Sequence, residues 1–119
     1  MSLMAYAIPI QPGKTPAWRK WADELNGPRR REFTASRERF GVRERTFLQE
    51  TPQGDVAIVT LEGDDPAGAF DKMMNNADPF TDWFIERAKE FHGLDPSHMS
   101  KAPSPVLVVD SEAVPVAAG

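Results

Sequence analysis

His92 is the side chain in this sequence best suited to acid–base chemistry, because an imidazole titrates close to neutral pH. It directly precedes Gly93, at the end of a segment with helical spacing. Two interpretations stay open. His92 is either a general base near the mouth of a sheet or a residue that interacts favourably with the carboxyl end of its helix. The sequence offers no other candidate catalytic residue.

Metal and thiol chemistry are not expected. The chain has no cysteine and two histidines, and the second, His98, has no acidic residue beside it at the spacing of metal ligands. Nucleophile-elbow, phosphate-loop, dinucleotide-binding and calcium-loop motifs are also missing from the sequence. We therefore expect no metal and no cofactor.

Arg29 is a candidate for binding an anionic group. It falls on an apolar stripe with helical spacing, where a guanidinium can hold a carboxylate or a phosphate through two hydrogen bonds. The alternative is that Arg29 reaches solvent or pairs with Glu24 or Glu32.

Three aromatic residues complete the candidate ligand-binding set: Tyr6, Trp18 and Trp21. The phenol of Tyr6 can offer a hydrogen bond to a ligand, and the indoles can line an aromatic cavity between helices and sheet. The same residue types at the same spacing are also what an ordinary core requires.

The composition is that of one soluble globular domain. The chain has 119 residues, 40% hydrophobic and 27% charged, and no apolar run long enough to cross a bilayer. Met1-Ser2-Leu3 precede a second methionine, as in an expression leader, so we expect a leader over 1–3, a domain over 4–110 and a tail over 111–119. Lack of a signal peptide and of cysteine indicates a cytoplasmic protein.

Charge is unevenly distributed along the chain. Residues 14–45 carry ten Lys/Arg and five Asp/Glu, a balance of +5, whereas the remaining four basic and thirteen acidic residues give −9. A moderately basic face could attract an anionic ligand or the acidic half of a second subunit. Acidic residues interrupt the basic run throughout, so we expect neither nucleic acid nor a membrane as a partner.

Residue periodicity predicts the elements that must position these side chains. Residues 4–10 alternate as a strand, and a helical stripe runs from Trp18 to Phe40 across Gly27-Pro28. This break implies either one kinked helix or two helices nearly in line. Further along, we expect a hairpin from the strands 42–51 and 56–62, helices over 65–74 and 78–92, and a final strand over 106–109.

The order β-α-β-β-α-β is typical of a ferredoxin-like α+β fold, a four-stranded antiparallel sheet with helices on one face. The other face would expose Phe47 and one side of residues 56–61. Since an apolar sheet face of that size is unfavourable in water, we expect two subunits to pack sheet to sheet as a homodimer.

Several motifs resemble the dimeric α+β barrel superfamily, and in particular small uncharacterised proteins within it. They are Pro12-Gly13-Lys14, Trp21 with Glu24-Leu25-Asn26, Arg29-Arg30-Arg31-Glu32, and Phe47-Leu48. The resemblance covers roughly residues 4–92 and extends distantly to antibiotic-biosynthesis monooxygenases, EthD-like proteins and stress-responsive barrel proteins. It implies a fold and no particular reaction. The Gly27-Pro28 pair departs from the uninterrupted first helix of that group.

Three functions are compatible with the sequence. The chain binds a small aromatic or acidic metabolite between sheet and helices, or it is a cofactor-independent monooxygenase, isomerase or cyclase, or it is a purely structural dimer. A cavity of about 300 Å³ or more with convergent polar groups favours the first two. A filled core with solvent-facing Arg and His side chains favours the third.

Overall fold

The computed structural model describes residues 2–76, 78–94 and 105–112. Its sheet consists of β1 (Ser2–Pro9), β2 (Val42–Gln49) and β3 (Val56–Gly63), in the order β1-β3-β2 with both pairs antiparallel. The predicted hairpin is confirmed as β2 and β3. Within the described ranges, no helix is long and apolar enough to span a membrane.

The register places alternate residues of all three strands on opposite faces of the sheet. Tyr6 pairs with Val59, which pairs with Thr46, and these side chains lie on the face toward the helices. The next register row, Ala7, Ile58 and Phe47, therefore lies on the other face, because side chains alternate along a strand.

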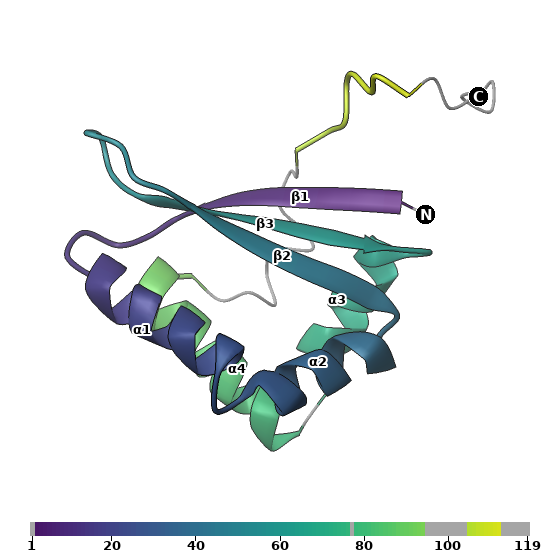
Figure 1. Cartoon of the computed structure of the whole chain (residues 1–119), viewed down its shortest axis with the longest axis horizontal. Helices are drawn as coiled ribbons and strands as arrows, with labels where there is room; N and C mark the ends of the chain where they lie inside the picture. Colours follow the sequence, from purple (N-terminus) through teal and green to yellow (C-terminus); the bar gives the residue numbers. More distant parts are fainter. Residues whose placement is uncertain (1, 77, 95–104, 113–119) are drawn as a thin grey trace.

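In the part of the chain that the structure describes, four helices cover one face of the sheet, whereas the ferredoxin-like pattern has two. They are α1 (Thr15–Asn26), α2 (Arg30–Arg39), α3 (Pro66–Met74) and α4 (Pro79–His92). Figure 1 shows α1 and α2 meeting at an angle below the sheet, with α3 and α4 forming a similar V behind them. The open arms of each V face the sheet.

The first V is produced by the break at Gly27-Pro28. Pro28 has no N–H to donate and its ring is incompatible with a continuing helix. The chain closes the end of α1 with a hydrogen bond of 2.9 Å from the Arg29 N–H to the Glu24 carbonyl. The sequence correctly indicated a break here. The structure has two separate helices, and they lie at an angle rather than nearly in line.

Capping residues fix the ends of α3 and α4 as the sequence predicted. The side chains of Asp65 and Asp78 accept hydrogen bonds from the N–H groups of Gly68 and Thr81, at 3.1 and 2.8 Å. Gly93 ends α4 in the left-handed conformation, with φ of 68°.

The core consists of two clusters of buried residues, both between the sheet and the helices. Tyr6, Leu61 and Met73 belong to the cluster beside α3, and Trp21, Ala57 and Phe91 to the cluster beside α1 and α4. These residues come from the predicted strand and helix faces.

The predicted fourth strand is not formed. Residues 105–110 have no regular secondary structure, and the side chains of Val106, Leu107, Val108 and Val109 are between 66% and 85% exposed. Four residues supply few ladder hydrogen bonds, so a strand here depends on a partner edge, and these residues pair with none of the three strands. The fold is therefore α+β with a three-stranded antiparallel sheet.

At the amino-terminal end, Ser2 and Leu3 form the first two residues of β1 and pair with Gly63 and Glu62. Most of the predicted loop after residue 94 and most of the tail after residue 111 lie outside the described residues.

Candidate functional site

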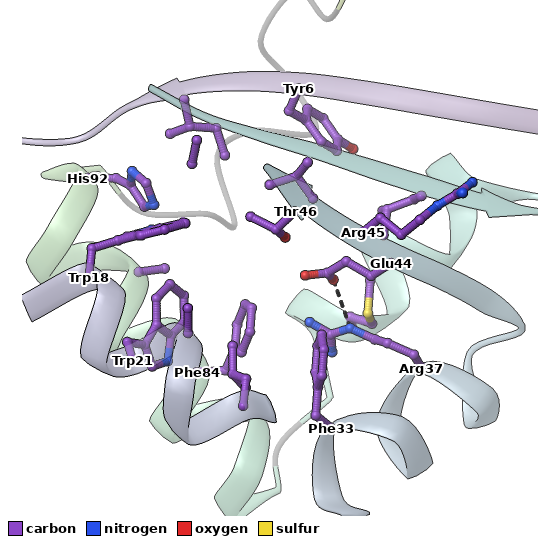
Figure 2. A pocket seen from close by; sticks show the side chains of 18 of the residues that line it. Tyr6, Trp18, Trp21, Phe33, Arg37, Glu44, Arg45, Thr46, Phe84 and His92 are labelled. Carbon is purple, nitrogen blue, oxygen red and sulfur yellow. Dashed lines mark hydrogen bonds and ion pairs between the residues drawn. The ribbon is translucent and has the colours of Figure 1, made fainter. Parts of the chain in front are cut away.

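A cavity of about 430 Å³ lies between the helix-facing side of the sheet and the diverging helices. Figure 2 shows Tyr6 and Thr46 from the sheet on one side of it, with Trp18 and Trp21 of α1 and Phe84 of α4 on the other. Most of the lining is apolar, as in typical small-molecule sites. The break at Gly27-Pro28 turns α2 away from the direction of α1, so the two helices lie at an angle below the sheet (Figure 1), and residues of both helices line the cavity.

A buried ion pair forms one end of the cavity. Nε of Arg37 donates to Oε1 of Glu44 at 2.8 Å, and both side chains are more than nine-tenths buried. The Arg37 guanidinium lies over two aromatic rings, 4.9 Å from the centroid of Phe33 and 4.7 Å from that of Phe84. The Glu44 carboxylate points into the cavity (Figure 2).

Tyr6 contributes a hydroxyl group that stays protonated. Burial, together with the negative charges of Asp71 and Glu44, raises the pKa of Tyr6 to about 12. Its hydrogen-bond partner is the Met4 sulfur at 3.4 Å, which is a weak acceptor. The phenol is therefore a neutral group that can donate to a stronger acceptor.

Two indole N–H groups beside the cavity have no acceptor among the described residues. Trp18 and Trp21 are each 6% exposed, and both Nε1 atoms are buried without a hydrogen-bond partner. An unpaired buried donor costs about 1–3 kcal/mol. A bound molecule with acceptor atoms would reduce this cost.

His92 lines the cavity at the end opposite the ion pair (Figure 2). Its Nδ1 lies 2.9 Å from the carbonyl oxygen of Pro9, at the end of β1. Burial lowers the pKa of His92 below 6.5, although the hydrogen bond with Pro9 partly opposes that effect. The imidazole is accordingly neutral at neutral pH.

The cavity communicates with solvent along the β2 edge. Thr46 lies on the helix-facing side of the sheet and its side chain is directed toward the cavity, yet the residue is exposed. Arg45 and Phe47, its neighbours in β2, also belong to the lining. A substituent at Thr46 would therefore obstruct entry without disturbing the buried core.

Of the five residues singled out from the sequence, four lie together around this cavity: Tyr6, Trp18, Trp21 and His92. Arg29 does not. Its guanidinium lies 4.0 Å from the ring centroid of Trp83 and within 3.4 Å of Glu32, outside the cavity lining.

Sequence reasoning missed Arg37 as a cavity residue. The helical stripe was continued through Pro28 without a change of phase, which favoured Arg29. Once α2 is treated as a separate helix, Arg37 follows Phe33 at a spacing of four and belongs to the same face. For Glu44, the partner of Arg37, the available signal was its position on the same strand face as Thr46.

No group of three or more potential metal ligands occurs in the described parts of the chain. Comparison with models of protein families, with curated proteins and with solved structures gave no match.

Proposed function

We propose that this protein binds a small, largely apolar and planar molecule with hydrogen-bond acceptor groups, in the cavity between sheet and helices. The observation that carries the proposal is the combination of about 430 Å³ of space with two buried indole N–H groups that have no acceptor in the described residues. Aromatic rings suit a planar ligand, and the N–H groups suit its carbonyl or carboxylate oxygens.

The charges in the cavity favour a neutral ligand or one with delocalised negative charge. Arg37 is already neutralised by Glu44, and the hydroxyl of Tyr6 is held in its neutral form. A compact dianion would have to compete with Glu44 for Arg37. An aromatic ketone, or a weakly acidic aromatic compound, fits better.

Native mass spectrometry of the protein purified gently from its own host tests this proposal. We expect a retained small-molecule mass that is lost in Thr46→Phe, because the new ring obstructs the cavity mouth. Thr34→Phe makes the same change at an exposed position of α2 outside the cavity, and should retain the molecule. A wild-type protein without any added mass, or equal retention in both variants, would count against the proposal.

We also propose that two copies pack sheet to sheet, as in the dimeric α+β barrel proteins that the sequence resembles. The face away from the helices supports this idea. Ala7, Ile58 and Phe47 form one row across all three strands, and Phe47 is 55% exposed. The other half of the face carries the Arg45–Glu62 ion pair at 3.6 Å, so only part of the interface would be apolar.

Light scattering during size-exclusion chromatography measures the oligomeric state directly. We expect a mass of twice the chain for the wild type and a shift toward monomer for Phe47→Glu, which places a charge in the apolar row. Ala17→Glu, at an exposed position of α1, is the control and should remain dimeric. A wild-type monomer at micromolar concentration would rule out this arrangement.

An enzymatic role remains the second candidate, and the observation that favours it is the neutral imidazole of His92 beside the cavity. Binding alone does not require a base at that position. A cofactor-independent isomerase or cyclase does require one.

A further inference from the structure

We propose that the cavity is a catalytic site in which Nε2 of His92 removes a proton from the carbon next to the carbonyl group of an apolar ketone. This inference rests on the proposed ligand site and adds a reaction and a substrate class to it. Three properties of the cavity support it: the tautomer of His92, the placement of its ring and the indole donor of Trp18 beside it.

The tautomer follows from the contact with Pro9. A carbonyl oxygen only accepts hydrogen bonds, so the proton of a neutral imidazole must be on Nδ1, which lies 2.9 Å from that oxygen. Nε2 is then the unprotonated nitrogen with a free lone pair. A general base requires this arrangement, in which one ring nitrogen is oriented by a fixed acceptor and the other faces the substrate.

The backbone around this contact is held by hydrogen bonds between β1 and its neighbours. The N–H of Ile10 donates to the Asp55 carbonyl, and that of Gln11 to the Phe91 carbonyl, both at 2.9 Å. These bonds fix the end of β1 against the end of α4. In Figure 2 the edge of the His92 ring remote from β1 is turned toward Trp18 and the cavity.

The surrounding groups suit an enolate. Removing an α-proton leaves negative charge on the former carbonyl oxygen, and hydrogen-bond donors positioned for such an oxygen are a large source of rate enhancement. The unpaired N–H of Trp18 is such a donor on the same wall as His92. A donor to the enolate oxygen does not need to carry a charge.

The reaction balances without an oxidant, a reductant or a cofactor. The lone pair of Nε2 takes the α-proton, the C–H bonding pair becomes the carbon–carbon π bond, and the carbonyl π pair moves to oxygen. The imidazolium then returns a proton to the same carbon, or to a conjugated one, which gives exchange or a shifted double bond. The substrate class is an apolar ketone with an enolisable C–H bond.

Deuterium exchange of 2-tetralone, a small bicyclic ketone, tests the proposal with the full-length protein. Loss of the signal of the protons on C1 is followed by NMR in heavy water. We expect the wild type to exceed an equal concentration of free imidazole by ~100-fold or more, the ordinary range for positioned acid–base catalysis. Quenching of tryptophan fluorescence by the same ketone measures binding separately.

Variants separate a catalytic His92 from a structural one. His92→Gln keeps an N–H that can donate to Pro9 but lacks a base, so it should bind 2-tetralone and exchange it no faster than the solution background. His98→Ala removes the only other histidine of the chain and should exchange at the wild-type rate. Trp18→Phe should lower the rate by about 10-fold or more, because it removes one enolate donor.

The pH profile supplies a readout that a structural role would not produce. The wild-type rate should rise with pH as His92 loses its proton, reach half its maximum below pH 6.5 and then level off. The other ionisable groups of the cavity lining are Tyr6 of β1, Arg37 of α2, and Glu44 and Arg45 of β2. The pKa of Tyr6, raised to about 12 by burial and by the charges of Asp71 and Glu44, keeps its hydroxyl neutral over this range.

The outcomes distinguish the two proposals. If 2-tetralone binds and the wild type does not accelerate exchange, or His92→Gln exchanges as fast as the wild type, the catalytic inference is wrong and the binding function stands. If 2-tetralone does not bind at all, the proposed ligand class is wrong and the reaction fails with it.

Discussion

Arg37 of α2 and Glu44 of β2 form an ion pair of 2.8 Å at the closed end of the cavity, and it joins the second arm of the first helix pair to the sheet. The pair matters for stability because each charge is buried and depends on the other. It also sets the polarity of the cavity, since the carboxylate faces the same space as the aromatic rings.

Breaking this pair should be costly. Arg37→Met leaves Glu44 as an unpaired buried charge, which is expected to lower the free energy of unfolding by about 3–5 kcal/mol. The double variant Arg37→Met/Glu44→Leu removes both charges and should recover most of that loss. Chemical denaturation measures both values.

Arg19→Met is the matched control, because Arg19 pairs with Glu50 on the surface, where both side chains are more than half exposed. An exposed pair contributes about 0–1 kcal/mol. If Arg37→Met costs no more than Arg19→Met, the ion pair does not have the structural role described here.

The ionisation of Tyr6 can be observed without interference, because it is the single tyrosine of the chain. Its raised pKa predicts that phenolate absorbance near 295 nm appears around pH 12 in the folded protein. The unfolded protein should titrate near pH 10. The folded state binds the hydroxyl proton of Tyr6 more tightly than the unfolded state does. The contribution of Tyr6 to stability is therefore complete below pH 10 and is lost as the pH rises to about 12. Phenolate formation near pH 10 in the folded protein would contradict the buried position.

Trp18→Phe should separate the cost of the unpaired N–H group from the packing of the ring. The smaller ring loses some burial, but it also removes a buried donor whose desolvation costs about 1–3 kcal/mol. We expect the stability of the free protein to change little, while affinity for an acceptor-bearing ligand falls by ~2- to 12-fold, the value of one net hydrogen bond. Calorimetric titration checks the affinity. A large loss of stability with unchanged affinity would assign Trp18 to the core alone.

Asp78 stabilises the start of α4 and should make stability sensitive to acid. Its carboxylate accepts hydrogen bonds from the N–H and the hydroxyl of Thr81, at 2.8 and 3.0 Å, and pairs with Arg39. Burial alone would raise the pKa of Asp78, but these contacts lower it below 3.8. The contribution to stability is therefore present above pH 3.8 and is lost as the pH falls through the folded-state pKa.

Asp78→Ala should cost about 1–2 kcal/mol at neutral pH, the usual value of a helix cap. Asp78→Asn keeps a capping oxygen and should cost less, while losing the acid dependence. Thermal denaturation as a function of pH measures both effects. If both variants lose the same amount of stability, the negative charge of Asp78, and not its capping oxygen, accounts for most of its contribution.

Local residue patterns were enough to predict most of the secondary structure. Alternation in residues 42–49 and 56–63 gave the correct faces of the hairpin, and Asp78 and Gly93 gave the bounds of α4. Residues 106–109 were wrongly predicted as a strand, because β-propensity describes a preference of the segment and not the existence of an edge that can pair with it.

The cavity was only partly predictable, for a geometric reason. Tyr6, Trp18, Trp21 and His92 come from faces that the sequence pattern assigns correctly. Arg37 depends on the direction that α2 takes after Pro28, which local spacing does not determine. Empty space between elements depends on how helices diverge, and no residue pattern encodes it directly.

Fluorescence titration with 2-tetralone, comparing the wild type with Thr46→Phe and Thr34→Phe, shows whether a small molecule occupies the cavity. Two of the three tryptophans line the cavity, so a ligand bound there should quench their emission to a saturating value. We expect saturable quenching for the wild type and Thr34→Phe, and at least ~10-fold weaker binding for Thr46→Phe, because the obstructed mouth excludes a buried ligand. Quenching that is unsaturable, or equal in all three proteins, would show that the cavity is not a binding site.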